Sequence, residues 1–246
     1  MKTFFFGEDN LTPNLALQIA HNKINCEIGK LAKINIQKSR KHTLDIADSE
    51  RTVYGINTGF GPLCNTKISK EKIKLLQENI LKSHSVGVGP LVPDLIVKLM
   101  LITKVHALSM GYSGISLEVL EQIIFFIHHD IIPEVPSQGS VGASGDLAPL
   151  AHLFLPIIGL GKVKVNGTTI SATKMHTIHH LNPVSLGAKE GLALINGTQF
   201  ILSYAVLGLS RFYNCLEAAD IVGAMSLEGL LGSISPFKKE LHKLRP

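Results

Sequence analysis

The stretch Gly139–Leu153, GSVGASGDLAPLAHL, stands out from the rest of the 246-residue chain. Two prolines precede it, three glycines punctuate it at three-residue spacing, and it then runs into an apolar segment. Its centre, Ala143-Ser144-Gly145, offers one ordinary hydroxyl as a reactive group. Small Gly-Ser loops usually do no more than turn the chain. A functional interpretation of this triplet therefore needs a specific chemical reason.

The residue types of the triplet suit a backbone cyclisation better than hydrolysis. A serine hydroxyl is a poor nucleophile without a neighbouring base, and Ser144 lacks the GxSxG spacing of a hydrolase elbow. Gly145 leaves its amide nitrogen unhindered, and Ala143 leaves its carbonyl carbon open. If the loop folds tightly, that nitrogen can close a five-membered ring on that carbonyl. Loss of water from the ring and from Ser144 then leaves an electron-poor exocyclic methylene.

The whole stretch resembles the signature of the aromatic amino acid ammonia-lyase family. Members carry a methylidene-imidazolone (MIO) group, made autocatalytically from Ala-Ser-Gly. Two further stretches resemble the family in the same order, namely YGINTGFGPL at Tyr54–Leu63 and KEGLALINGTQ at Lys189–Gln199. The resemblance spans almost the whole chain. It implies an MIO group formed from Ala143, Ser144 and Gly145, with no external cofactor.

The resemblance also assigns roles to two polar residues. Tyr54 matches the catalytic tyrosine of the family, which acts in proton transfer. A phenol ionises only well above neutral pH, so this role requires surroundings that stabilise phenolate; the alternative is a buried ring with a hydrogen-bonded hydroxyl. Asn196 matches the asparagine beside the prosthetic group and the substrate; the alternative is an amide hydrogen-bonded inside a core helix.

The stretch LLQENILKSHSVGVG at Leu75–Gly89 bears on the substrate. In the family, the pair shortly before the glycines is Phe-Leu in phenylalanine lyases, His-Leu in tyrosine lyases and Ser-His in histidine lyases. Here the pair is Ser83-His84, and an imidazole can serve a substrate imidazole as donor or acceptor. The alternative is a helix-end histidine bonded to backbone carbonyls.

The resemblance therefore implies non-oxidative elimination of ammonia from L-histidine to give trans-urocanate, in histidine degradation. Two alternatives stay open: a lyase acting on tyrosine or phenylalanine, and an inactive, truncated helical remnant. Family members are homotetramers whose chains continue well past the equivalent of Pro246. We therefore expect residues 1–246 to form the N-terminal part of a single lyase domain, with the C-terminal half absent.

Helix signals dominate the chain and predict a mainly α fold of long packed helices, Gly-rich loops and a small β-hairpin. Thr12, Ser69 and Ser116 are expected to begin helices, and residues 92–111 to form another. The hairpin is predicted at KVKVNGTTI, residues 162–170, around Asn-Gly. Two long apolar segments, Gly191–Leu209 and Cys215–Leu231, are expected as further helices.

Composition limits the classes of function. The net charge is +5 and the basic residues are scattered, so the cluster at residues 237–246 predicts a solvated helix face rather than a nucleic-acid site. Three separated cysteines and no metal-ligand spacing indicate a reducing compartment, the cytoplasm, and no metal. Polar residues inside Gly191–Leu209 favour a buried core helix over a membrane span. The expected partners are L-histidine and, in the full-length form, copies of the same chain in a homotetramer; no nucleic acid and no membrane are expected.

Overall fold

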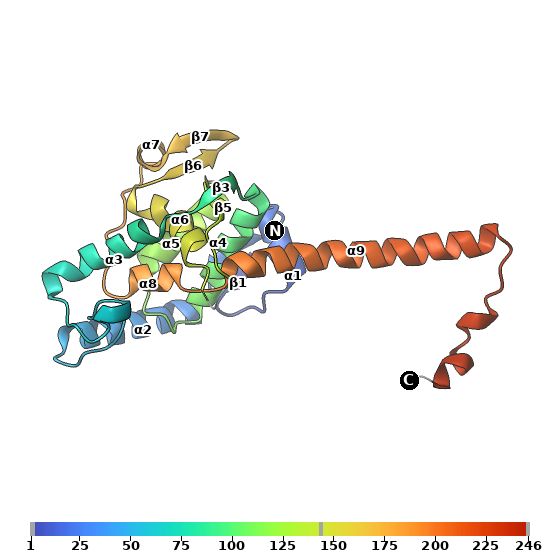
Figure 1. Cartoon of the computed structure of the whole chain (residues 1–246), viewed down its shortest axis with the longest axis horizontal. Coiled ribbons are helices and arrows are strands. Elements are labelled where there is room, and N and C mark those ends of the chain that lie inside the picture. The colour runs from blue at the N-terminus through green and yellow to red at the C-terminus, as the bar shows by residue number, and fades with distance from the viewer. Residues whose placement is uncertain (1–2, 143–144, 245–246) are drawn as a thin grey trace. The chain divides into compact units, whose positions relative to one another are not determined.

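The computed structural model of the chain describes residues 3–142 and 145–244, so Ala143 and Ser144 lie outside the described residues. Contacts divide the chain into two units, Met1–Val206 and Leu207–Pro246. The described helices, named as in Figure 1, are α1 (Pro13–Ala20), α2 (Lys30–Asp48), α3 (Lys70–His84), α4 (Asp94–Ser109), α5 (Leu117–His128), α6 (Leu147–Phe154), α7 (Ala172–Ile178), α8 (Glu190–Ile195) and α9 (Gln199–Gly229). The mainly α prediction is confirmed.

Short strands connect the helices of the first unit. They are β1 (Thr3–Phe6), β2 (Asn25–Ile28), β3 (Val88–Leu91), β4 (Ile132–Pro133), β5 (Pro136–Gln138), β6 (Lys162–Val165) and β7 (Thr168–Ser171). The predicted hairpin is β6–β7, with positive φ at both Asn166 and Gly167, as a primed two-residue turn requires. β1 pairs with β2 in parallel, and β4 joins the edge of the hairpin.

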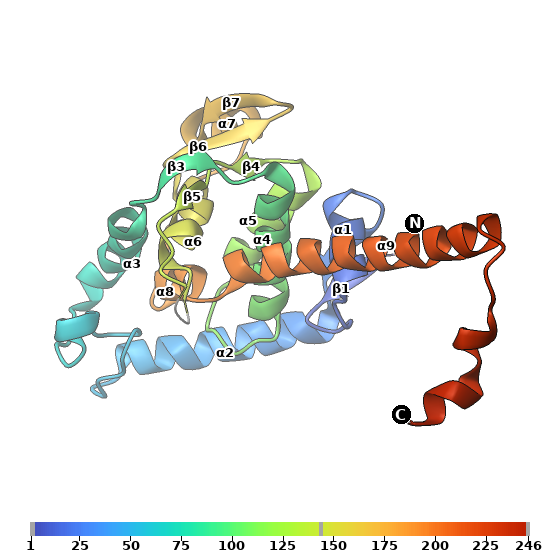
Figure 2. The same cartoon turned by 45° about the vertical axis from the view of Figure 1, so that its right-hand side comes forward.

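The core of the first unit is built around α4, which packs against α1 and α5. Residues 96–105 of α4 are all buried, on every side of the helix, so α4 is a central helix rather than an amphipathic one. α3, α6 and α8 lie side by side next to this core (Figures 1 and 2). β3 pairs with β5, which places the chain after α3 beside the start of the Gly139–Leu153 stretch.

Two predicted helix starts are confirmed by capping hydrogen bonds. The Thr12 hydroxyl accepts the Leu15 N–H at 3.3 Å, and the Ser116 hydroxyl accepts the Val119 N–H at 3.4 Å. Ser69 precedes α3 as predicted, but its side chain makes no capping hydrogen bond. The amphipathic α2 was not predicted from sequence.

The prediction of one buried helix over Gly191–Leu209 is wrong. α8 ends at Ile195, a turn covers residues 196–198, and α9 begins at Gln199. α9 then continues without a break through the second apolar segment, because residues 210–214 contain no proline or glycine to end it. Its first turns bury Gln199, Ser203 and Val206 in the first unit.

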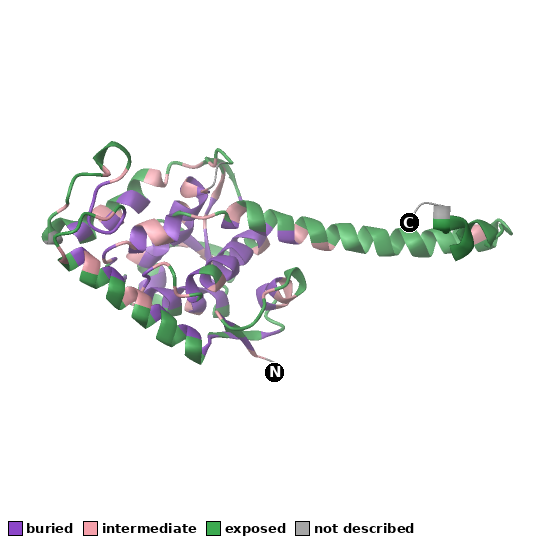
Figure 3. Cartoon of the chain, turned by 90° about the horizontal axis from the view of Figure 1, so that it is seen from below, coloured by how far each residue is buried: buried purple, intermediate pink, exposed green. Residues whose placement is uncertain are grey.

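The second unit contains the rest of α9 and two 3-10 segments, Ser235–Phe237 and Lys239–Leu244. None of its described side chains is buried, as the green end of α9 in Figure 3 shows. Residues 237–243 of the basic cluster are exposed, as predicted, although residues 239–244 form 3-10 turns rather than an α-helix. Among the described residues, one stretch, Glu190–Gly229, is long and apolar enough by composition to cross a membrane, since it contains an 18-residue window with a mean hydropathy of 1.6.

Candidate active site

The turn between α8 and α9 lies against the Gly-rich stretch. A Cβ placed on Gly145 would be 3.0 Å from Asn196 Oδ1 and 3.5 Å from Leu147 Cδ2. The structure thus brings together two of the predicted site residues, Gly145 and Asn196, from segments fifty residues apart in sequence. It does so because the chain turns sharply at Asn196 instead of continuing as a helix.

Asp146 ties this corner together and was not singled out from the sequence. Its side chain is fully buried, and its Oδ1 accepts the Ser140 hydroxyl at 2.9 Å. Its Oδ2 accepts the N–H groups of Phe200 and Ile201, at 3.0 and 3.2 Å. A carboxylate at this place satisfies free donors in the first turn of α9 and complements the helix dipole. The Asp146 N–H in turn donates to the Gly197 carbonyl at 2.7 Å.

Lys104 of α4 reaches the same turn from the core. Its Nζ donates to the Asn196 carbonyl at 2.8 Å and lies 3.5 Å from Gln199 Oε1. Burial lowers the pKa of Lys104 to about 7, and the nearby Asp146 carboxylate opposes that shift. The sequence signal that could have found it is a lone lysine inside the apolar run LMLITKVHAL at residues 99–108.

The loop that carries Tyr54 is held by its own buried polar residues. Asn57 Oδ1 accepts the Val53 N–H at 2.8 Å, and Thr58 Oγ1 accepts the Gly55 N–H at 3.2 Å. Gly55 has φ +74°, and a Cβ there would lie 2.4 Å from a methyl carbon of Leu192 in α8. The motif residues around Tyr54 therefore place the loop against α8, the helix that directly precedes Asn196.

The Tyr54 side chain is 56% exposed, with its ring edge-on to Phe60 at a centroid distance of 6.1 Å. The alternative of a buried ring is therefore wrong. The structure places Tyr54 beside α8, and no hydrogen bond among the described residues joins it to Asn196 or Gly145.

Ser83 and His84 form the end of α3, where Ser83 is exposed and His84 half-buried. His84 Nδ1 lies 2.8 Å from the Ile80 carbonyl and must donate to it, since a carbonyl only accepts. The backbone-bonded histidine foreseen as an alternative is thus the observed geometry. In the neutral ring, this hydrogen bond fixes the tautomer and leaves Nε2 as an acceptor. The pair is linked to the Asn196 corner through the packing of α3 on α6 and α8.

A buried ion pair fixes the start of α8. Glu190 Oε2 lies 3.2 Å from Arg40 Nη2 and accepts the Gly187 N–H at 2.6 Å. Glu190 Oε1 accepts the Ser116 N–H at 2.8 Å. With both oxygens satisfied, the buried carboxylate orients the short helix that presents Asn196.

His152, at the end of the Gly-rich stretch, binds the loop after α3. Its Nε2 accepts the Gly87 N–H at 3.0 Å, which requires a neutral ring with the proton on Nδ1. Burial lowers the pKa of His152 and so favours that neutral form.

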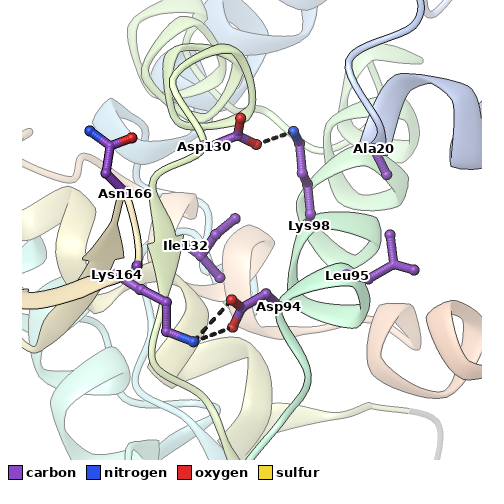
Figure 4. A pocket seen from close by; sticks show the side chains of 9 residues that line it. Ala20, Asp94, Leu95, Lys98, Asp130, Ile132, Lys164 and Asn166 are labelled. Carbon is purple, nitrogen blue, oxygen red and sulfur yellow. Dashed lines mark hydrogen bonds and ion pairs between the residues drawn. The ribbon is translucent and has the colours of Figure 1, made fainter.

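A cavity of about 360 Å³ lies elsewhere in the first unit and contains none of the predicted site residues. In Figure 4, Lys164 faces Asp94, with Nζ 2.7 Å from Oδ1, and Lys98 faces Asp130. The charged side chains that line this cavity pair with one another, and none of the predicted site residues lies there. The cavity is therefore not the candidate site. Among the described residues, no group of three or more His, Cys, Asp or Glu could hold a metal ion.

Comparisons with known proteins identify the family. The family model described as aromatic amino acid lyase matches residues 11–246. The histidine ammonia-lyase of Streptococcus sanguinis (strain SK36) is 40% identical over 238 residues, covering 97% of this chain and 46% of the relative.

Solved structures agree. Histidine ammonia-lyase from Trypanosoma cruzi matches with a TM-score of 0.91 at 34% identity, over 100% of this chain and 47% of that one. Tyrosine aminomutase from Streptomyces globisporus matches with a TM-score of 0.92 at 31% identity, over 100% of this chain and 46% of that one. The chain spans about half the length of the curated relatives it matches. The chain belongs to the aromatic amino acid lyase family.

Proposed function

We propose that this chain is part of a histidine ammonia-lyase, a carbon–nitrogen lyase that eliminates ammonia from L-histidine to give trans-urocanate. The observation that carries the proposal is the position of Asn196 Oδ1 against Gly145, within the Ala-Ser-Gly signature. The Ser83-His84 pair and the names of the relatives support histidine as the substrate.

The residues present suit an MIO group. Gly145 N bonds to the Ala143 carbonyl carbon, and the carbonyl oxygen leaves as water with the protons of the Gly145 and Ser144 nitrogens. Ser144 then loses its hydroxyl and its α-proton as a second water. At Gly145, a Cβ would be 3.0 Å from Asn196 Oδ1, so only glycine leaves that oxygen undisturbed. When formed, the group supplies an electrophile toward the amino group or the ring of the substrate.

The other residues then bind the substrate and handle protons. The Asn196 amide offers both a donor and an acceptor beside Gly145. His84, with Nδ1–H held by the Ile80 carbonyl, presents Nε2 as an acceptor for an N–H of a substrate imidazole. Tyr54, seated on α8 by its loop, is the proton-transfer residue in this proposal.

We also propose a cytoplasmic homotetramer that binds neither nucleic acid nor membrane and needs no external cofactor or metal. Large apolar side chains of α9 are exposed in the second unit, including Phe212, Ile221 and Met225. Exposed apolar surface of this kind marks an interface, and further copies of the chain are the proposed cover. Gln199 and Ser203 are buried in the first unit, and the Ser203 hydroxyl donates to the Gln199 carbonyl, which favours a core role over a lipid-facing one.

A second candidate is an enzyme of the same fold that acts on tyrosine or phenylalanine. The similarity to a tyrosine aminomutase favours it. The Ser83-His84 pair favours histidine instead.

The two candidates differ in the substrate consumed. We expect the chain, joined after Pro246 to the remaining part of the Streptococcus sanguinis relative, to form urocanate from L-histidine, measured by its absorbance. Ser144→Ala in the same chimera is the matched control and should be inactive. Ser83→Phe with His84→Leu should weaken histidine turnover. A folded chimera that converts L-tyrosine or L-phenylalanine but not L-histidine, or that matches Ser144→Ala, contradicts the proposal.

A further inference from the structure

Lys104 is a buried lysine without a carboxylate partner at bonding distance among the described residues. Burying an ammonium group is costly unless it is paired and hydrogen-bonded. Lys98, six residues earlier on α4 and similarly buried, follows the usual solution and pairs with Asp130. Lys104 instead donates its hydrogen bonds to the turn between α8 and α9. The burial of this lysine at the turn therefore needs an explanation other than an ion pair.

That turn is held from two sides at consecutive carbonyls. Lys104 Nζ donates to the carbonyl of Asn196 at 2.8 Å, and the Asp146 N–H donates to the carbonyl of Gly197 at 2.7 Å. One donor comes from the core helix α4 and the other from the end of the Gly-rich stretch. Fixing two successive carbonyls restrains the peptide planes of the turn, and with them the Cα–Cβ bond from which the Asn196 amide projects.

The space around Lys104 Nζ is also closed. A Cβ on Gly197 would lie 3.0 Å from Nζ and 2.2 Å from Gln199 Oε1. The turn is therefore packed directly onto the lysine head group, with no room for a side chain between them. Its hydrogen bond to the Asn196 carbonyl is available to the ammonium and the neutral amine alike, since both have N–H donors.

We propose that Lys104 is a positioning residue of this site, which holds the Asn196 carbonyl so that the Asn196 amide is presented to Gly145. The inference rests on the proposed function, because the purpose of that placement is cyclisation and dehydration at Ala143-Ser144-Gly145. Lys104 acts through Asn196 and does not itself take part in bond making.

The test compares two buried lysines of the same helix in the 246-residue chain. Methionine has a similar length and no donor, so Lys104→Met removes the hydrogen bond and Lys98→Met is the matched control. Intact mass at successive times after synthesis measures the loss of two waters, and far-UV circular dichroism reports folding. We expect Lys98→Met to dehydrate like the parent chain and Lys104→Met at least roughly tenfold more slowly, the loss expected for a hydrogen bond to a charged group.

A second variant guards against a Lys104→Met chain that fails to fold. Gly197→Ala keeps the lysine but pushes the turn away from it, and should slow dehydration in the same way, whereas Gly208→Ala has no neighbour within 4 Å and should not. If the Lys104→Met and Gly197→Ala chains dehydrate at the parent rate, the inference about Lys104 is overturned and the proposed function is not. A parent chain that keeps both waters overturns the proposed function and the inference with it.

Discussion

At Asp146 a single buried carboxylate accepts hydrogen bonds from Ser140 and from two backbone N–H groups of α9. The resemblance to the family predicted two residues of this corner, Gly145 and Asn196. It did not predict Asp146 or Lys104, because a single charged residue in an apolar region has no periodic signal. Its partners come from distant segments, and only the tertiary structure shows them.

Replacing Asp146 tests how much its hydrogen bonds contribute to stability. Asp146→Asn keeps the shape but loses the charge and one acceptor, and we expect the free energy of unfolding to fall by about 2 kcal/mol. Urea unfolding measures the change. Asp94→Asn is the matched control: Asp94 pairs with Lys164 at a partly exposed site, where an ion pair contributes less than about 1 kcal/mol. Equal losses of unfolding free energy in the two variants would show that the hydrogen bonds of Asp146 contribute no more than an exposed ion pair.

His152 makes the stability of the first unit depend on pH. The Gly87 N–H needs a neutral acceptor, and burial lowers the pKa of His152 below its ordinary value of 6.5. The unfolded chain therefore binds the proton more readily, so this contribution is complete above pH 6.5 and is lost as the pH falls through the folded pKa. Urea midpoints from about pH 7.5 to pH 5 measure it.

The control for that measurement is His152→Gln, whose side-chain oxygen can accept the Gly87 N–H without titrating. His106 and His179 also have lowered pKa values and titrate in both proteins, so only the difference between the curves belongs to His152. Parallel curves for the parent and the variant would rule out the proposed link.

At the scale of elements, the decisive feature is the break between α8 and α9. Helix caps at Thr12 and Ser116 and the Asn-Gly hairpin could be predicted, because each depends on a local signal. The break was not predicted, because residues 191–209 carry no charge and no proline, and the turn is held by Lys104 and Asp146 from elsewhere. α2 was not predicted because most of its residues are polar, and β1 and β2 were not predicted because four residues are too few for an alternating pattern to show.

The contact of α8 with α3 gives a prediction at this scale. A Cβ on Gly191 would lie 2.3 Å from the Gln77 carbonyl oxygen, so Gly191→Ala must push the two helices apart. We expect a loss of about 1–3 kcal/mol in unfolding free energy, as for other overpacked sites. Gly208→Ala, in the open part of α9, should change stability by less than about 1 kcal/mol and toward greater stability, because alanine is the better helix former. The same effect in both variants would argue against a tight α3–α8 contact.

At the scale of the whole molecule, the sequence predicted the family and the mainly α fold but not the division into two units. None of the described side chains of the second unit is buried. Hydrophobic periodicity does not predict this exposure, because an apolar helix has the same pattern whether it is covered by its own chain or by another. That residues 1–246 are the N-terminal part of a single lyase domain stays a prediction.

The proposed assembly is tested on the exposed face of α9. Ile221 and Met225 are four residues apart, on one side of the helix, and are 62% and 66% exposed. We expect the double variant Ile221→Glu with Met225→Glu to shift sedimentation toward smaller species, while Glu217→Gln leaves it unchanged. With the chain joined after Pro246 to the remaining part of the Streptococcus sanguinis relative, a parent that sediments as a monomer at high concentration would contradict the homotetramer.

The most direct test of the central claim is the mass of the peptide that contains Ala143, Ser144 and Gly145. Proteolysis of the purified chain, followed by mass spectrometry, locates any dehydration, with Ser144→Ala as the control that has no hydroxyl to lose. The account predicts a parent peptide lighter by two waters within this triplet and a control that does not show that loss. A parent peptide with its full, uncyclised mass would contradict it.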